Sequence, residues 1–600
     1  MLYYNPLDEF CKNPIGAVKE SDTLTFRVKC DSSVCTLVLT KDGCDCSKRH
    51  DLIKKDGYFE GELQVPVGLY WYYFDIGNGE FVGKGENYLG EISRYPQAFQ
   101  LSVSSKGYKV PSWMKGGIMY QIFPDRFYRG EENKSVSPEK ILHENWGETP
   151  IYKPNFAGQV LNNDFFGGDF KGITEKLPYL KSLNVSVIYL NPIFKAYSNH
   201  RYDTGDYMSF DPLLGTEDDF KNLLQKAEEL GIKIILDGVF NHSGDDSVYF
   251  NKYGRYDSIG AYQSEKSQYR NWFKFINYPK EYESWWGIKT LPAYDKNCKE
   301  YIDYIAGEDG VIEKYTKMGI GGWRLDVVDE LPAHLVKEIR KAVKKVNKNA
   351  IIIGEVWEDA SNKVAYGKRR EYFLGGELDS VMNYPLKNAI LAYVTTGNLD
   401  ELRQVIFEQI DHYPKDVLDS LMNIISTHDT FRILSAVSGI NTAGLSKQSM
   451  ENLIVSGDAL KLAKEKVKMA TLLQFTLCGV PSIYYGDEIG MQGFKDPLNR
   501  RCFDWGNEDQ EMLDWYRKIS KIRSTYSAFE DGKFKEIHAK GGAFVFARYN
   551  DKCEVAVAIN VGDKQKNMSF DGTIINLLDG TEHEEHFMLE PHSFGVFIKK

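Results

Sequence analysis

The sequence Gly321-Gly322-Trp323-Arg324-Leu325-Asp326-Val327-Val328-Asp329 is the most informative part of the chain, because an apolar strand there ends in charged residues. Arg324 and Asp326 stand two residues apart, so in an extended chain their side chains project from the same face. A guanidinium beside a carboxylate favours the ionised form, which predicts a lowered pKa for Asp326. An ionised carboxylate is the form that acts as a nucleophile. The alternative is a structural Arg–Asp pair that closes a strand.

Other apolar segments resemble strands and alternate with helical segments. The expected strands are 117–123, 185–190, 232–237, 322–326, 350–355, 380–384, 421–426 and 480–485, and helical patterns occupy 217–230, 335–346, 399–409 and 460–477. Apolar strands buried on both faces and separated by amphipathic helices indicate parallel α/β architecture. Eight such strands predict a closed (β/α)₈ TIM barrel.

The barrel is expected to carry three additions. Residues 1–112 show short alternating strands separated by turn residues, the pattern of an N-terminal β-sandwich. The catalytic barrel would occupy 113–528, with an inserted subdomain at about 243–306 that is too long for a simple loop after the third strand. Alternation returns in 529–600, which predicts a C-terminal β-sandwich. In the first domain Tyr70 to Tyr73 alternate, so one pair of aromatic side chains would face the core and the other could present a platform for sugar rings.

Composition narrows the classes of partner. The chain has 600 residues and a formal charge of −11, which argues against nucleic acid or an anionic membrane as the main partner. Neither a basic segment followed by an apolar one nor a membrane-length apolar run is evident, which favours a cytoplasmic protein. The alternative is a secreted protein whose signal peptide has been removed. The nine cysteines are expected to be free thiols rather than disulfides or metal ligands.

Acidic and histidine residues follow several of the expected strands. Asp237, Asp326 and Glu355 end the third, fourth and fifth strands, and His428-Asp429 follow the seventh. Because the carboxyl ends of barrel strands meet at one rim, these groups should converge. Closely packed carboxyl groups raise one another's pKa, so one can stay protonated while another is ionised. That arrangement suits cleavage of a glycosidic bond.

The motifs also resemble those of a known family. The segments are Asp237-Gly238-Val239-Phe240-Asn241-His242, Gly322-Trp323-Arg324-Leu325-Asp326, Gly354-Glu355-Val356-Trp357 and Ser426-Thr427-His428-Asp429. In this order they resemble the four signature regions of the α-amylase family. With the N-terminal β-domain, the chain is similar to the neopullulanase, cyclomaltodextrinase and maltogenic amylase subfamily.

The resemblance implies a role for each matching residue. Asp326 would be the nucleophile, Glu355 the general acid and then base, and Asp429 would hold the sugar at the cleavage position. Retention of configuration predicts that the two reacting carboxyl groups lie about 5–5.5 Å apart. The substrate-binding positions would be Tyr202, His200, Asp237, His242, Arg324, Glu330, Trp357, His428, Asp496 and Arg500.

Some of these assignments have structural alternatives. Asp496 and Arg500 would bind glucose units on the non-reducing side, or could form a salt bridge in the eighth barrel loop. Glu330 and Trp357 would contact the acceptor side, where Trp285 and Trp286 would widen an aromatic platform for branched substrates. A histidine can also be a satisfied core group, and Asp237 can be purely structural.

No cofactor is expected to be required. Relatives carry a structural Ca²⁺, for which Gly168 and Asp169 are the candidate ligands, although segment 129–133 lacks the usual run of Asn and Asp. The partner would be an α-glucan oligosaccharide or polysaccharide. The resemblance also suggests a homodimer in which the N-terminal domain of one subunit closes the cleft of the other.

The predicted function is that of a retaining α-glucan hydrolase cutting α-1,4 links, with α-1,6 links as an extension, in maltodextrins, pullulan, cyclodextrins or starch. Three alternatives remain open. The same site could serve a 4-α-glucanotransferase, the chain could bind glucan without catalysis, or it could be a metal-dependent hydrolase. The last is disfavoured because the histidines lack the spacing of metal ligands.

Overall fold

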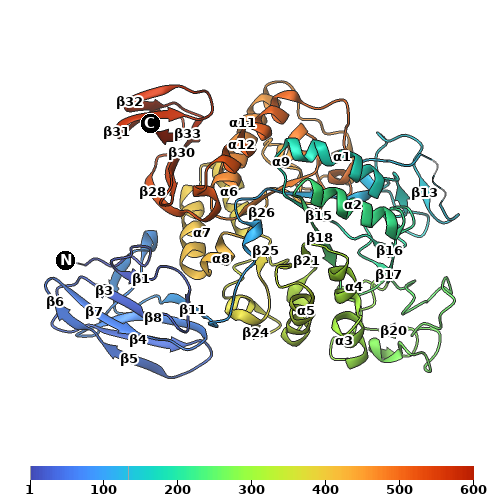
Figure 1. Ribbon diagram of the computed structural model, residues 1–600, viewed down its shortest axis with the longest axis horizontal. Helices are drawn as coiled ribbons and strands as arrows, with labels where there is room; N and C mark the ends of the chain where they lie inside the picture. Colours follow the sequence, from blue (N-terminus) through green and yellow to red (C-terminus); the bar gives the residue numbers. More distant parts are fainter. Residues whose placement is uncertain (1, 133, 135) are drawn as a thin grey trace.

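The computed structural model describes residues 2–132, 134 and 136–600 (Figure 1). At its centre lies an eight-stranded parallel sheet in the order β25-β22-β21-β18-β15-β12-β27-β26. The strands are β12 (Met119–Ile122), β15 (Val187–Leu190), β18 (Lys233–Gly238), β21 (Gly322–Leu325), β22 (Ile351–Gly354), β25 (Ser380–Val381), β26 (Met422–Asn423) and β27 (Val480–Tyr484). A parallel bridge between Met382 and Met422 joins the two ends and closes the barrel. The predicted fold class is confirmed.

Helices cover the outside of this barrel. The longer ones are α1 (Phe170–Ser182), α2 (Glu217–Glu229), α4 (Val311–Lys317), α5 (Ala333–Val346), α6 (Tyr384–Thr396), α7 (Leu399–His412), α11 (Gly457–Thr476) and α12 (Gln510–Thr525). Four short ones are α8 (Lys415–Leu418), α9 (Ile433–Ala436), α10 (Lys447–Glu451) and α13 (Ala528–Asp531). Alternate residues of β22 show why both faces are apolar: Ile351 and Ile353 fill the barrel interior, whereas Ile352 joins the core under the helices.

Two excursions from the barrel rim shape the site. After β15 the chain makes the hairpin of β16 (Phe194–Ala196) and β17 (Thr204–Phe210). The segment between β18 and β21 contains β19 (Phe275–Asn277), β20 (Glu281–Tyr282) and α3 (Lys299–Ala306), packed around buried aromatic rings such as Phe250 and Trp272. This segment includes the inserted subdomain predicted at 243–306.

The N-terminal domain consists of two facing sheets. One has the order β1-β3-β7-β6 and the other β10-β9-β8-β11-β2, with β4 and β5 added beside β8. Their bounds are β1 (Lys12–Asn13), β2 (Val18–Lys19), β3 (Leu24–Val28), β4 (Thr36–Lys41), β5 (Ser47–Asp51), β6 (Ile53–Lys55), β7 (Tyr58–Leu63), β8 (Gly68–Gly77), β9 (Glu80–Lys84), β10 (Gly90–Ser93) and β11 (Phe99–Ser104). Tyr70 and Tyr72 are buried, whereas Trp71 and Tyr73 are half-buried, as the alternation predicts.

The C-terminal strands form one six-stranded sheet in the order β28-β29-β30-β33-β31-β32 rather than two separate sheets. They are β28 (Lys533–Lys540), β29 (Ala543–Tyr549), β30 (Glu554–Asn560), β31 (Lys566–Asn576), β32 (Glu582–Leu589) and β33 (Ser593–Lys599). The six strands form one continuous sheet because the long strand β31 pairs with both β32 and β33. One face joins the barrel core through residues such as Phe544 and Phe546.

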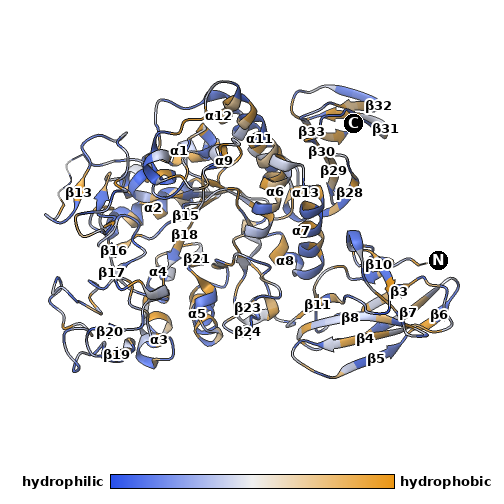
Figure 2. Cartoon of the chain, turned by 180° about the vertical axis from the view of Figure 1, so that it is seen from behind, coloured by the Kyte–Doolittle hydropathy of each residue, from blue (hydrophilic) through white to orange (hydrophobic). Residues whose placement is uncertain are grey.

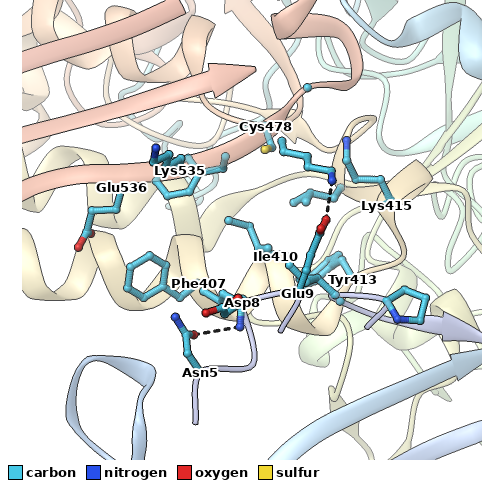
Figure 3. Close-up of a pocket in the computed structure, with 18 of the residues that line it drawn as sticks. Asn5, Asp8, Glu9, Phe407, Ile410, Tyr413, Lys415, Cys478, Lys535 and Glu536 are labelled. Atoms are coloured by element: carbon cyan, nitrogen blue, oxygen red, sulfur yellow. Dashed lines mark hydrogen bonds and ion pairs between the residues drawn. The ribbon is translucent and has the colours of Figure 1, made fainter. Parts of the chain in front are cut away.

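The two terminal domains lie on the same side of the barrel, next to α7, both in Figure 1 and in the view from behind (Figure 2). Lys12 of the first domain forms a fully buried salt bridge of 2.6 Å with Asp411 of α7. A cavity of about 860 Å³ lies where the three units meet, and Figure 3 shows Glu9, Phe407 and Glu536 around it. Among the described residues, no helix combines the length and apolar character needed to cross a bilayer.

Candidate active site

One guanidinium brings three carboxylates together at the rim of the barrel. Arg324 Nη1 donates to Asp237 Oδ1 and to Asp326 Oδ1, both at 2.7 Å, and its Nη2 lies 2.8 Å from Glu355 Oε2. The three acids come from the ends of adjacent strands, because β18, β21 and β22 pair in register. All four side chains are at least nine-tenths buried, so these charges interact with little screening by water.

Both carboxylate oxygens of Asp237 accept hydrogen bonds. Besides Arg324, its carboxylate accepts hydrogen bonds from the hydroxyls of Tyr189 at 2.6 Å and Tyr202 at 2.9 Å. Its side chain is completely buried. These bonds fit a group that positions Arg324 and Tyr202 rather than one that meets a substrate.

Glu355 is oriented by hydrogen bonds from residues that follow β21 and β22. Its Oε2 accepts the backbone N–H of Val327 at 2.8 Å, and its Oε1 accepts the indole N–H of Trp357 at 3.1 Å. Val327 has a φ of 38°, which is rare for a β-branched residue and turns its N–H toward Glu355. The residue directly after Asp326 therefore positions the second carboxyl group.

A second group of residues lies beside this cluster. Arg500 pairs with Asp429 at 3.3 Å and with Asp496 at 3.0 Å, so the salt bridge expected in the eighth loop also reaches Asp429. His428 Nε2 lies 3.1 Å from Asp429 and 2.6 Å from the Tyr202 hydroxyl. Since about a third of the Asp429 side chain is exposed, it remains accessible to a ligand.

Burial governs the protonation of the acids. It raises the pKa of Asp326 well above the usual range, and Glu355 and Asp237 add to this, although Arg324 opposes it. Burial also raises the pKa of Asp237 and Asp429. The prediction of a lowered pKa for Asp326 is therefore wrong, because it counted the neighbouring cation but not the loss of water. Such a cluster can keep one proton while another carboxyl is ionised, as an acid–nucleophile pair requires.

The three histidines are neutral. Burial lowers the pKa of His200 and of His242 to about 3, and burial together with Arg500 lowers that of His428 well below its usual value. The side-chain amide of Gln121 donates to His428 Nδ1 at 2.8 Å, which leaves Nε2–H as the donor toward Asp429 and Tyr202.

His242 and His200 differ in what they contact. His242 is buried, its Nε2 has no hydrogen-bond partner among the described residues, and its ring stacks on Trp285 with centroids 5.0 Å apart. A buried nitrogen without a partner is costly unless a ligand supplies one. His200 accepts the backbone N–H of Tyr202 at 3.1 Å.

Comparison with known proteins agrees with this geometry. Residues 121–533 match the model of the alpha amylase catalytic domain. A cyclomaltodextrinase from Thermoanaerobacter pseudethanolicus is 32% identical over 85% of this chain and 82% of its own length. The chain belongs to the α-amylase family. The resemblance in the motifs is therefore confirmed.

Two further relatives extend the likeness beyond the α-amylase domain. An amylopullulanase from Thermoanaerobacter thermohydrosulfuricus is 36% identical over 95% of this chain but only 43% of its own length. The chain therefore spans less than half of that relative. The solved structure of the type III pullulan hydrolase from Thermococcus kodakarensis superposes with a TM-score of 0.71 and 25% identity, covering both chains completely.

The calcium site expected from the α-amylase resemblance does not fit the side chains present. Asp169 accepts backbone N–H groups from Gly130, Glu131 and Gly172, and its Oδ2 lies 2.7 Å from Lys134 Nζ. An ammonium therefore occupies the place of a cation, and Asp169 is the N-cap of α1. Within the described part of the chain, no cluster of His, Cys, Asp or Glu is arranged for a metal ion. Asn133 of the predicted loop lies outside the described residues.

Among the acceptor-side residues predicted by the α-amylase resemblance, Trp357 contacts Glu355, whereas Glu330 contacts Trp286 and Tyr366, a residue that the sequence did not indicate. Trp357 is 46% exposed and stacks on Tyr384 with centroids 3.8 Å apart. Glu330 accepts the indole N–H of Trp286 at 3.1 Å and the hydroxyl of Tyr366. Tyr366 has no motif around it, so nothing in the sequence separates it from other surface tyrosines.

Proposed function

We propose that this member of the α-amylase family is a retaining α-glucan hydrolase that cleaves α-1,4-glucosidic bonds, and α-1,6 bonds in branched substrates, through a covalent glucosyl-enzyme. Maltodextrins, pullulan, cyclodextrins and starch are the candidate substrates. The names of its relatives, which include amylopullulanases, cyclomaltodextrinases and a pullulan hydrolase, support this range.

One observation carries the proposal. Asp326 and Glu355 contact two nitrogens of the same guanidinium, at 2.7 and 2.8 Å, so both reach one small volume at the rim. Retaining glycosidases need a nucleophile and an acid that flank a single bond, with their carboxyl groups about 5–5.5 Å apart. Asp429, Arg500 and His428 lie to one side, where they can hold the sugar that is being transferred.

The chemistry proceeds in two balanced steps. Glu355 donates its proton to the glycosidic oxygen as an Asp326 oxygen bonds to the anomeric carbon, and the leaving sugar departs with the bonding electrons. The Glu355 carboxylate then takes a proton from water, whose oxygen attacks the same carbon and releases Asp326. Two inversions give net retention of configuration.

The two acids can be tested separately. Asp326→Asn and Glu355→Gln should each lower turnover of maltoheptaose by several orders of magnitude, because each removes a group required in both steps. With an aryl α-maltotrioside, whose leaving group needs no proton, Glu355→Gln should still release a burst of phenol and Asp326→Asn should not. Asp75→Asn, on the N-terminal domain, is the control. Near-normal turnover by either variant, or an inverted product in a freshly sampled NMR spectrum, would overturn the assignment.

Transfer to a sugar acceptor is the second candidate function. Trp357 donates its indole N–H to Glu355 and is 46% exposed, so it offers an aromatic face where an incoming sugar would displace water. A product profile on maltooligosaccharides, pullulan and β-cyclodextrin, with and without added maltose, separates the two functions. Predominant formation of longer oligosaccharides would make the chain a 4-α-glucanotransferase.

A further inference from the structure

The loop that follows β22 begins with Glu355 and ends at the hairpin of β23 (Val364–Ala365) and β24 (Lys368–Arg369). Within it, Trp357 donates its indole N–H to Glu355 Oε1 at 3.1 Å and stacks on Tyr384. The position of the Glu355 carboxyl group therefore depends on how the residues after Trp357 are held. Their contacts lead out of the barrel, toward the N-terminal domain.

Asp359, two residues after Trp357, holds this loop together. Its Oδ1 accepts the backbone N–H and the hydroxyl of Ser361 at 2.9 and 2.7 Å, and its Oδ2 accepts hydrogen bonds from the Asn362 amide at 3.2 Å and from His412 Nδ1 at 3.0 Å. Burial raises the pKa of Asp359, but the bonds from His412 and Ser361 outweigh burial and bring the pKa below its usual value. An ionised carboxylate with this many donors from the protein anchors the loop rather than meeting a substrate.

The histidine in this set is the last residue of α7, the helix that packs against the N-terminal domain (Figures 1 and 2). His412 Nε2 lies 2.9 Å from the hydroxyl of Tyr88, which belongs to η1 (Glu86–Tyr88) of that domain. The Tyr88 hydroxyl donates to Asp411 at 3.1 Å, and Asp411 also forms the buried salt bridge with Lys12. All four of these side chains are buried. A continuous row of buried polar groups therefore joins the N-terminal domain to the loop after β22.

Gln100 of β11 makes a second connection between the N-terminal domain and the same loop. Its amide nitrogen donates to Ser361 Oγ at 2.9 Å, and its carbonyl oxygen accepts a hydrogen bond from Asn362 at 2.7 Å. The hydroxyl of Tyr413, directly after α7, accepts the backbone N–H of Ala360 at 3.0 Å. Four consecutive residues of the loop are thus bonded either to the N-terminal domain or to the end of α7.

The backbone at Tyr88 shows that the structure of the N-terminal domain imposes its contact with α7. Asn87 and Tyr88 have φ values of 55° and 66°, in the left-handed region that bulky side chains rarely adopt. Such conformations persist only where the surrounding structure fixes them. The ring of Tyr88 packs edge-on against Phe99 of β11 and at an angle against Phe407 of α7, which holds its hydroxyl at the boundary between the domains.

We propose that the N-terminal domain is a positioning element for the general acid of the same chain. It holds the loop that presents Trp357 to Glu355, and the positioning residues are Tyr88, Gln100, Asp359 and His412. A proton donor must lie within hydrogen-bond reach of the leaving oxygen, and a misplacement of about 1 Å can lower the rate by up to about 100-fold. This inference rests on the proposed α-glucan activity.

The test uses two substrates of nearly equal size that differ in their need for an acid. 4-Nitrophenyl α-maltotrioside releases a weakly basic phenolate, which departs without protonation, whereas phenyl α-maltotrioside releases a more basic phenolate, whose departure is assisted by the Glu355 proton. Because the two substrates share the same sugar and a similar ring, a change in sugar binding affects both alike. The ratio of kcat/KM for the nitrophenyl substrate to that for the phenyl substrate therefore measures proton donation.

Loss of the positioning contacts should raise this ratio. We expect a rise of about threefold in Tyr88→Phe and in Gln100→Leu, and of about tenfold in Asp359→Ala, because kcat/KM falls for the phenyl substrate and stays constant for the nitrophenyl one. Asp359→Asn, which keeps an acceptor oxygen for Ser361, should give an intermediate ratio. With maltoheptaose, the same variants should lose kcat rather than gain KM.

Tyr393→Phe is the matched control. Tyr393 is a buried tyrosine of α6 whose hydroxyl donates to the carbonyl oxygen of Gly542 at 2.9 Å, so it joins the barrel to the C-terminal sheet. Its replacement removes a hydroxyl from a contact between domains, as Tyr88→Phe does, but far along the chain from Glu355. The ratio in Tyr393→Phe should equal that of the wild type, and urea unfolding measured in parallel gives the stability of each variant.

The outcomes are distinct. A wild-type ratio in folded Tyr88→Phe, Gln100→Leu and Asp359→Ala, even with reduced stability, would overturn the proposal, because the contacts would then only hold the domains together. An equal rise in Tyr393→Phe would also overturn it, since loosening any contact between domains would be enough. If the wild-type chain cleaved neither aryl substrate nor maltoheptaose, the proposed α-glucan activity itself would fail, which is a different result from an unchanged ratio.

Discussion

Replacing Arg324 by Gln tests the catalytic cluster most directly. Arg324 contacts Asp237 and Asp326 at 2.7 Å and Glu355 at 2.8 Å. An adjacent arginine typically lowers the pKa of a carboxyl group by about 1–3, so removing Arg324 should raise the pKa of Asp237 and Asp326 further. A larger fraction of Asp326 would then carry a proton near neutral pH than in the wild type, and a protonated carboxyl group is not a nucleophile. We expect kcat/KM near pH 6 to fall by about 10- to 1000-fold.

The assay is the pH dependence of kcat/KM for maltoheptaose. The acidic limb, where activity rises as Asp326 ionises, should move to higher pH in Arg324→Gln and less in Arg324→Lys, which keeps the charge but not the two-pronged contact. Carboxyl groups whose pKa is raised in the folded state bind protons more tightly there, so this variant should gain stability as the pH falls and lose it as the pH rises. A limb at the wild-type pH in a folded Arg324→Gln variant would refute the electrostatic role.

Three other predictions concern buried charges. Lys134→Met should lower the free energy of unfolding by about 3 kcal/mol, because it leaves Asp169 without its cation. EDTA should not change the melting temperature of the wild type. A lower melting temperature in EDTA would contradict the assignment of the Lys134 ammonium as the partner of Asp169. Lys12→Met should lower the free energy of unfolding by about 3–5 kcal/mol and make the N-terminal domain susceptible to limited proteolysis, because it leaves Asp411 buried without a partner. A loss below about 1 kcal/mol would show that the buried salt bridge does not stabilise the contact between the domains. Burial raises the pKa of Glu488 to about 7, so its stabilising protonation is lost as pH rises from about 4.5 through 7. The free energy of unfolding of the wild type, measured with urea, should fall by up to about 3 kcal/mol over that pH range, and that of Glu488→Gln should not.

The barrel could be predicted because each of its strands is apolar on both faces. The segment 350–355 was expected to be a strand and is β22 (Ile351–Gly354), since its isoleucines alternate between barrel interior and outer core. Strand ends were harder to place. The expected strand 380–384 ends after Val381, because the Asn383 side chain accepts the N–H of Leu386 and begins α6. The residue that caps α6 therefore lies inside the segment that was expected to be a strand.

The site could be predicted in outline but not in its contacts. The spacing of Arg324 and Asp326 correctly places them together, and parallel pairing brings Asp237 beside Arg324. The raised pKa of Asp326 depends on burial, which the local sequence does not reveal. The left-handed turn at Val327 and the ammonium of Lys134 beside Asp169 depend on tertiary structure, and no short motif indicates them.

Hydrolysis and transfer at this site differ in which molecule, water or a sugar, reacts in the second step. In the proposed mechanism both begin from the same glucosyl group on Asp326, and the second step depends on whether water or a sugar hydroxyl is beside Glu355 when that carboxylate accepts a proton. A sugar that stacks on Trp357, whose indole N–H bonds to Glu355, stays longer at this position, so it competes better with water. Replacing Trp357 by Ala should therefore lower the ratio of transfer to hydrolysis, while the carboxyl groups of Asp326 and Glu355 are kept. If Trp357→Ala gave the wild-type ratio of transfer to hydrolysis over a wide range of maltose concentration, the acceptor would have to be held by other residues.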